Sequence, residues 1–102
     1  MADLAIYEIP LKAIPHQEFS FSVSELDCEF SIRIKQLKKI LIMDLIKDGE
    51  VIIFKGLNCK ANTDLLSCLK HKANMFLFFD SLKENFTYND FDNTTRLYYA
   101  IS

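Results

Sequence analysis

The sequence predicts a mostly β fold, a mainly antiparallel barrel or sandwich of about seven strands with one short α-helix. Three observations carry this expectation: long stretches alternate apolar and polar residues, an Asp-Gly pair separates two apolar runs, and both ends of the chain have the composition of strands. The 102 residues are close to the commonest domain size, so we expect residues 1–102 to form a single domain.

The first strand is expected over residues 4–10, where it stops because Pro10 has no N–H to donate to a ladder. Pro10 and Pro15 bracket an extended segment, since proline also disfavours helical geometry in the residue before it. Residues 4–19 cannot pair as a long central strand, and we expect them to run along an edge of the domain.

Two strands with one buried face follow, joined by a turn at Ser24–Asp27. Their apolar residues recur at every second position, and the residues between them are serine or charged. The inward set is Phe19, Phe21 and Val23 in the first strand, and Cys28, Phe30, Ile32 and Ile34 in the second.

Residues 40–47 and 51–57 are expected to form a hairpin around Asp48-Gly49. This dipeptide favours a tight hairpin turn because both turn positions need a positive φ. The flanking runs are nearly continuously apolar, so both faces of the hairpin are expected to be covered. Gly56 is expected to mark a bulge or the end of a strand.

The predicted helix spans Thr63 to Lys72, with a capping Asn or Thr at its start and basic residues in its last turn. Strands are predicted over residues 75–79 and 95–101, separated by a polar loop over residues 81–94. Six residues on the apolar side of their elements are expected to share one core: Phe21, Phe30, Ile32, Leu66, Leu77 and Leu97.

Composition and charge limit the function. A net charge of −2 gives no basic footprint for nucleic acid. The longest uninterrupted apolar run, residues 40–43, is far shorter than a membrane helix, and the first residues carry no signal-peptide pattern, so neither a membrane span nor secretion is expected. Three irregularly spaced cysteines favour a reducing compartment over a disulfide framework.

Catalytic and metal-binding motifs are weak, so we expect no enzyme, no cofactor and no metal site. Cys59, Cys68 and His71 could in principle hold zinc, but the spacing lacks paired knuckles, and a free cysteine is commonly a small core residue. Neither histidine lies in a pattern that would activate a nucleophile, and 2 glycines cannot build a phosphate-binding loop.

Binding of single-stranded nucleic acid, or of a peptide, is the alternative function. Arg33, Lys35, Lys38 and Lys39 form a basic cluster, and the chain is rich in phenylalanine. The aromatic residues, however, lie on the inward side of their strands, and nucleic acid is not the partner we expect.

Six segments in order resemble the phage baseplate plug family, small proteins of contractile-tail phages and prophages. Two lie at the start of the chain, Tyr7-Glu8-Ile9-Pro10-Leu11 and Gln17-Glu18-Phe19. The others are Ile42 to Gly49, Asn62-Thr63-Asp64-Leu65-Leu66, Tyr88-Asn89-Asp90 and Arg96-Leu97-Tyr98-Tyr99. The chain departs from the family in having no tryptophan.

The resemblance implies a structural protein of a phage or prophage tail, a plug-like component at the tube–hub end of the baseplate. It would be made in the cytoplasm of a bacterial host, reside in the virion tail and contact hub or tube proteins, with a homo-oligomer as a further option. From the residues themselves we expect the interface to use the proline-interrupted start and the aromatic residues of the polar loop: Tyr7, Pro10, Phe86, Tyr88 and Phe91. The alternative is that both segments fold back to cover the ends of the barrel.

Overall fold

Two antiparallel sheets make up the computed structural model, which describes residues 5–38, 40–66, 75–91 and 93–101. The strands are β1 (Ala5–Ile9), β2 (His16–Val23), β3 (Cys28–Leu37), β4 (Ile40–Lys47), β5 (Val51–Asn58), β6 (Phe76–Ser81) and β7 (Thr95–Ile101), with two 3-10 turns, η1 (Ser24–Leu26) and η2 (Tyr88–Asp90).

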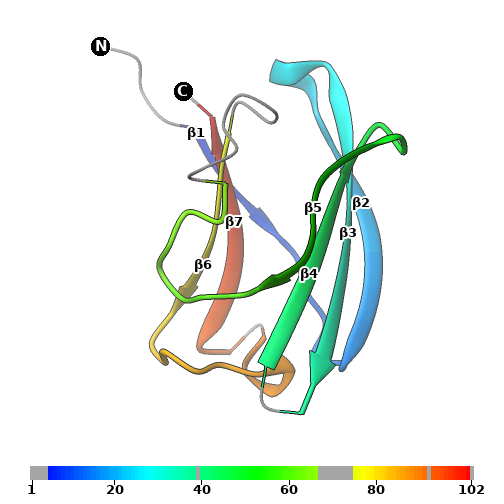
Figure 1. Cartoon of the computed structure of the whole chain (residues 1–102). Helices are drawn as coiled ribbons and strands as arrows, with labels where there is room; N and C mark the ends of the chain where they lie inside the picture. Colours follow the sequence, from blue (N-terminus) through cyan, green and yellow to red (C-terminus); the bar gives the residue numbers. More distant parts are fainter. Residues whose placement is uncertain (1–4, 39, 67–74, 92, 102) are drawn as a thin grey trace.

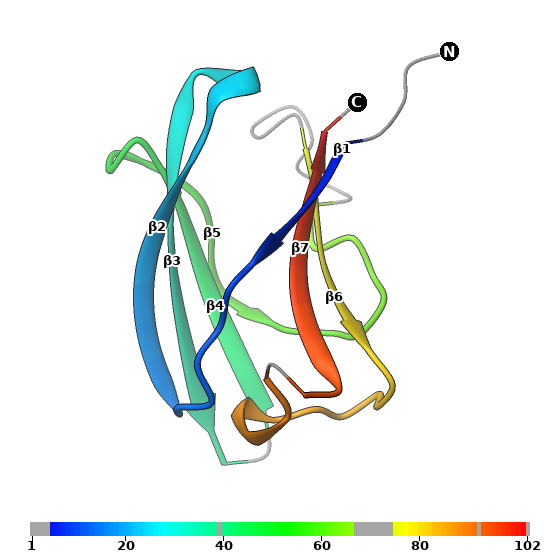
Figure 2. The ribbon, with the colours of Figure 1, turned by 180° about the vertical axis from the view of Figure 1, so that it is seen from behind.

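The strands divide into a three-stranded sheet in the order β1-β7-β6 and a four-stranded sheet in the order β2-β3-β4-β5. The sheets face each other as two layers, with β1 and β7 on one side and the β2–β5 meander on the other (Figure 1; Figure 2, the reverse view). The mostly β, antiparallel expectation is therefore confirmed. Of its two forms, the sandwich describes the arrangement, since the described strands do not close into a barrel.

The predicted helix at Thr63–Lys72 falls mainly on residues 67–72, which lie outside the described residues. Its first four residues form a bend and a turn. There the Asp64 carboxylate accepts the backbone N–H of Leu66 at 3.0 Å and that of Leu77 in β6 at 3.1 Å. Asp64 thus fixes this turn against β6. Short polar side chains such as Asp can bond nearby backbone N–H groups in this way, which competes with the backbone hydrogen bonds of a helix. Within the described part of the chain, helical structure is limited to η1 and η2.

The β2–β3 hairpin confirms the period-two pattern. The strands pair without interruption from His16↔Lys35 to Val23↔Cys28. Of the inward residues of β3, Phe30, Ile32 and Ile34 are buried and Cys28 is half-buried, while the residues between them are not buried. The expected turn is η1, closed by Asp27 at a left-handed φ of 51°. Alternation alone therefore places both strands and the face that each buries.

The β4–β5 hairpin turns at Asp48 and Gly49, whose φ values of 53° and 71° confirm the predicted turn. The expectation that both of its faces are covered is wrong. Ile40 and Ile52 are 46% and 55% exposed, because the outer face of the four-stranded sheet has no second described layer over it.

Gly56 lies in a bulge, as its position in the strand predicted. The pairing steps from Met43↔Leu57 to Leu45↔Phe54, so β5 has one extra residue there. Gly56 has a φ of 68°, and its N–H donates to the Asp44 carboxylate at 2.8 Å. Asp44 thus satisfies the backbone group that the bulge removes from the ladder.

The core lies between the two sheets. Five of the six expected core residues are fully buried there, namely Phe30, Ile32, Leu66, Leu77 and Leu97, and Phe21 packs half-buried against them. Phe21 bridges the layers, because its ring stacks on Phe30 in its own sheet at 5.7 Å and on Tyr99 of β7 at 5.1 Å.

Candidate interface surfaces

Tyr7 lies on the edge strand β1 and ties the two sheets together. Its ring stacks on Tyr99 at 5.0 Å, and its hydroxyl donates to the Glu25 carboxylate in η1 at 2.7 Å. That hydrogen bond to Glu25 is the main reason that the pKa of Tyr7 lies above its usual value of 10.0. The side chain remains 41% exposed, so it combines a structural contact with accessible aromatic surface.

Pro10 is exposed and directly follows β1. The expected edge position of the first segment is confirmed, because β1 borders the three-stranded sheet and β2 borders the four-stranded sheet. The segment between β1 and β2 is hydrogen-bonded to Gln17 in β2. The Gln17 side chain donates to the Lys12 carbonyl at 2.8 Å and accepts the Lys12 N–H at 3.2 Å. Residues 5–19 therefore run along the edges of the two sheets.

The aromatic residues of the loop between β6 and β7 do not form the exposed group that the sequence suggested. Phe86 and Phe91 are only 4% and 2% exposed, with ring centroids 4.8 and 6.1 Å from that of Phe79 in β6. Tyr88 is partly buried against the same core. The expected exposure is therefore wrong for Phe86 and Phe91, because the loop folds back under the lower end of the sandwich (Figure 1).

A capping box holds this loop in place. The Asp90 carboxylate accepts the backbone N–H of Thr87 at 2.9 Å and pairs with the Lys83 ammonium at 3.0 Å. These two interactions, the Thr87 N–H first, lower the pKa of Asp90 below its usual 3.8. The N–H of Tyr88 donates to the side chain of Gln36 at 3.2 Å and so joins the loop to the end of β3.

The outer face of the three-stranded sheet carries a group of apolar side chains that was not predicted from the sequence. Register brings Ile6, Ala100 and Phe76 into one row across the three strands, and Tyr98 and Phe78 into the next. A hollow of about 390 Å³ opens beside them, lined by Ile6, Asn62, Asp64, Phe76, Phe78 and Ala100. Ile6 is 56% exposed at its rim.

A sequence signal for this surface exists in residues 76–79, Phe-Leu-Phe-Phe, which are apolar on both faces of β6. A strand without polar alternation is typical of one that is covered on both sides. Here one side is the core and the other is this outer face.

The basic cluster is not a continuous positive strip. Arg33 forms an ion pair with Glu18 at 3.2 Å and faces Asp44 in the register of the sheet. Lys35 lies on the same outer face, Lys38 forms the β3–β4 turn at a φ of 55°, and Lys39 lies outside the described residues. Acidic neighbours thus offset the charge that a nucleic-acid groove needs.

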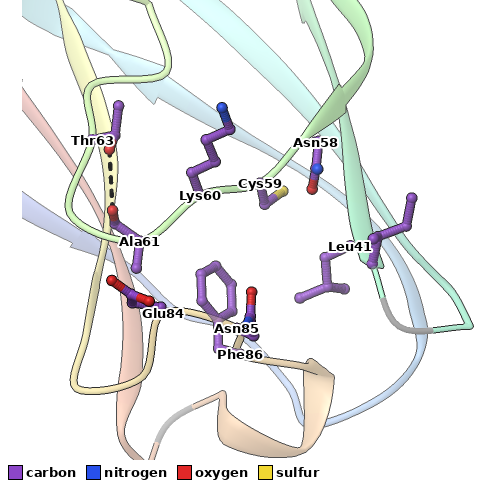
Figure 3. A pocket seen from close by; sticks show the side chains of 10 residues that line it. Leu41, Asn58, Cys59, Lys60, Ala61, Thr63, Glu84, Asn85 and Phe86 are labelled. Carbon is purple, nitrogen blue, oxygen red and sulfur yellow. Dashed lines mark hydrogen bonds between the residues drawn. The ribbon is translucent and has the colours of Figure 1, made fainter.

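A second hollow of about 360 Å³ opens where β4, residues 58–63 and residues 84–86 meet (Figure 3). Its wall mixes polar side chains such as Lys60 and Glu84 with apolar ones such as Leu41 and Phe86. Burial raises the pKa of Cys59 to about 12, so this thiol stays protonated at neutral pH and is a poor nucleophile.

Cys59 also belongs to the zinc hypothesis, whose other members, Cys68 and His71, lie outside the described residues. Within the described ranges, no three or more His, Cys, Asp or Glu side chains gather as metal ligands would. No helix of that same part of the chain is long and apolar enough to cross a membrane.

The family model described as "Cyanophage baseplate Pam3 plug gp18" matches residues 6–102. The chain matches no curated protein.

Proposed function

The chain belongs to the cyanophage baseplate plug family, and on that premise we propose that it acts as a plug-like protein at the tube–hub end of a phage or prophage baseplate. The family supports a structural role in the baseplate of a virion tail. The finer proposal is that the protein is not an enzyme, that the bacterial host makes it in its cytoplasm, and that it works through contacts with hub or tube proteins.

The observation that supports such contacts is the apolar outer face of the three-stranded sheet. Isolated exposed apolar residues are ordinary on soluble proteins, whereas a contiguous apolar surface rimmed by polar groups is typical of a binding site. Ile6, Phe78 and Tyr98 form such a surface, Ala100 is buried beneath it, and the Glu8–Arg96 ion pair, at 3.3 Å, borders it.

Of the interface residues expected from the sequence, Tyr7 and Pro10 fit this proposal. Both are exposed and lie on or directly after β1, the strand that carries Ile6. The Tyr7 side chain lies at the seam between the sheets, against Tyr99 and Glu25, so it would contribute from beside the outer face. Tyr88 is a second, smaller contact at the lower end of the sandwich. Phe86 and Phe91 support the loop from inside and are not part of the proposed contact surface.

The test is a matched pair of substitutions, Ile6→Asp and Ile52→Asp. The two isoleucines are 56% and 55% exposed and lie on the outer faces of different sheets. Binding is measured by co-purification and titration with the hub and tube proteins of the same phage. A charge at a buried contact costs about 2 kcal/mol or more, so Ile6→Asp is expected to weaken binding by about 30-fold.

Ile52→Asp is expected to leave binding unchanged, and thermal melting of both variants checks that they fold. Loss of binding in Ile52→Asp alone would move the contact to the other sheet. Unchanged binding in both variants would contradict an apolar contact at either face.

A further inference from the structure

Among the described residues, the outer edge of β2 differs from the other sheet edges in having neither a bulge nor a paired strand, and the segment before it contacts only its first residues, through the Gln17–Lys12 hydrogen bonds. The edge of β6 is covered by the segment before it, where Asn62 and Leu65 donate backbone N–H groups to Phe79 and Leu77, both at 2.7 Å. The edge strand β5 is interrupted by two register shifts, which natural edges use to prevent pairing. β1 has 5 residues, whereas β2 has 8 and pairs with β3 without a bulge.

Side chains do not block the β2 edge either. Within β2 no lysine or proline occurs, and its one carboxylate, Glu18, is neutralised by Arg33. Ser20 and Ser22 are exposed, and Phe19 and Phe21 are half-buried at the seam between the sheets. A further strand beside β2 would extend the sheet and cover these two rings.

Hydrogen bonds of β3 show which β2 groups point outward. The N–H and C=O of Glu29 are directed to the β4 side, where they bond to Asp48. Gln36 lies an odd number of residues along β3 from Glu29, so its backbone N–H points to the other side, toward β2. There it donates to the Pro15 carbonyl at 2.9 Å. The residues opposite Glu29 and Ser31, which are Ser22 and Ser20, therefore point their backbone groups away from β3, at the free edge.

The sequence of β2 is self-complementary around Ser20. Antiparallel pairing of two copies with a two-fold axis at Ser20 places Phe19 opposite Phe21 of the second copy on the inner side, twice. On the outer side Ser20 meets Ser20 and Glu18 meets Ser22, so no like charges lie opposite each other. The outward backbone groups of Glu18, Ser20 and Ser22 would then form about six hydrogen bonds.

We propose that β2 is a self-association edge, at which two copies of this chain pair antiparallel about Ser20 into a continuous eight-stranded sheet. The proposal does not depend on the contact to tail proteins, and its test uses the purified chain alone.

Light scattering over a range of concentrations measures the molar mass of the native chain and three variants. The native chain is expected to form a dimer. Ser20→Lys places two ammonium groups on the two-fold axis, and Ser20→Pro removes the outward N–H without removing a bond to β3, so both are expected to remain monomers. Ser31→Lys is the matched control. Ser31 lies opposite Ser20 on β3, so this substitution introduces the same charge one strand away from the edge.

Cysteine cross-linking tests the register. In the proposed pairing the two Ser20 Cα atoms lie about 5.5 Å apart, within the range of a disulfide. Ser20→Cys is therefore expected to yield a covalent dimer under mild oxidation. Ser22→Cys is not, since its two copies are displaced by four residues, about 13 Å. The native chain controls for cross-links through its own cysteines.

Dimers of the native and Ser31→Lys chains, with monomers of both Ser20 variants and a cross-link only in Ser20→Cys, would support the proposal. A native chain that is monomeric at every concentration overturns it. So does a dimer that persists in folded Ser20→Pro, since the association would then use another surface.

Discussion

Replacing Phe91 with alanine tests whether the loop between β6 and β7 is part of the core. Phe91 is 2% exposed, and its ring lies parallel to that of Phe79 with the centroids 6.1 Å apart. Leu82, in the same loop, is 89% exposed and provides the control, Leu82→Ala.

The expected loss follows from this burial. Deleting a buried phenylalanine side chain costs about 3–5 kcal/mol, and the lower value is appropriate at a loop, which can partly relax into the space. The unfolding entropy of 102 residues is about 0.21 kcal/mol/K, from about 2.1 cal/mol/K per residue. A loss of about 3 kcal/mol therefore lowers the melting temperature by about 14 °C.

Urea unfolding followed by circular dichroism measures the free energy, and thermal melting gives the shift in temperature. Leu82→Ala is expected to change stability by no more than about 0.5 kcal/mol. A loss below about 1 kcal/mol for Phe91→Ala would show that the ring contributes little to the core, and the loop would again be a candidate for an exposed aromatic contact.

Two further predictions concern the bulge and the capping box. Gly56→Ala meets no atom within 4 Å but holds a φ of 68°, so urea unfolding should show a loss of about 1–2 kcal/mol from backbone strain alone, and an unchanged midpoint would count against that strain. The lowered pKa of Asp90 stabilises the fold above pH 3.8, and this contribution is lost as the pH falls through the folded-state pKa. Asp90→Asn should therefore be less stable at neutral pH and lose less stability than the native chain on acidification; parallel pH profiles of melting temperature would refute this.

Most of the strands are predictable from the sequence because their pattern is local. Alternation from Phe19 to Ile34 fixes two strands and their buried faces, and Asp48-Gly49 fixes a turn whose φ values only a few residue types adopt readily. Pro10 likewise places the first strand at an edge. Each of these signals depends on neighbours in the sequence.

The division of the strands into two sheets depends on contacts between residues that are distant in the sequence. So does the burial of the loop between β6 and β7. Nothing near Phe91 indicates that it packs on Phe79, and the polar residues around it suggest exposure instead. Asp44 serves a bulge 12 residues away, at Gly56, and Ile6 becomes part of a surface only because β1 pairs with β7. The edge position of the segment that carries Ile6 was therefore predictable, whereas the residues of the proposed contact surface were not.

The strand order also determines when each sheet can form during synthesis. β2 to β5 pair with their immediate neighbours in sequence, and such local hairpins close within microseconds. β7 is the centre of the other sheet, so β1 and β6 have no strand to pair with until residues 95–101 have left the ribosome. We therefore expect the four-stranded sheet to keep its apolar inner face uncovered until then, and the pairing that joins Ala5 to Ile101 to be the slow, non-local step of folding.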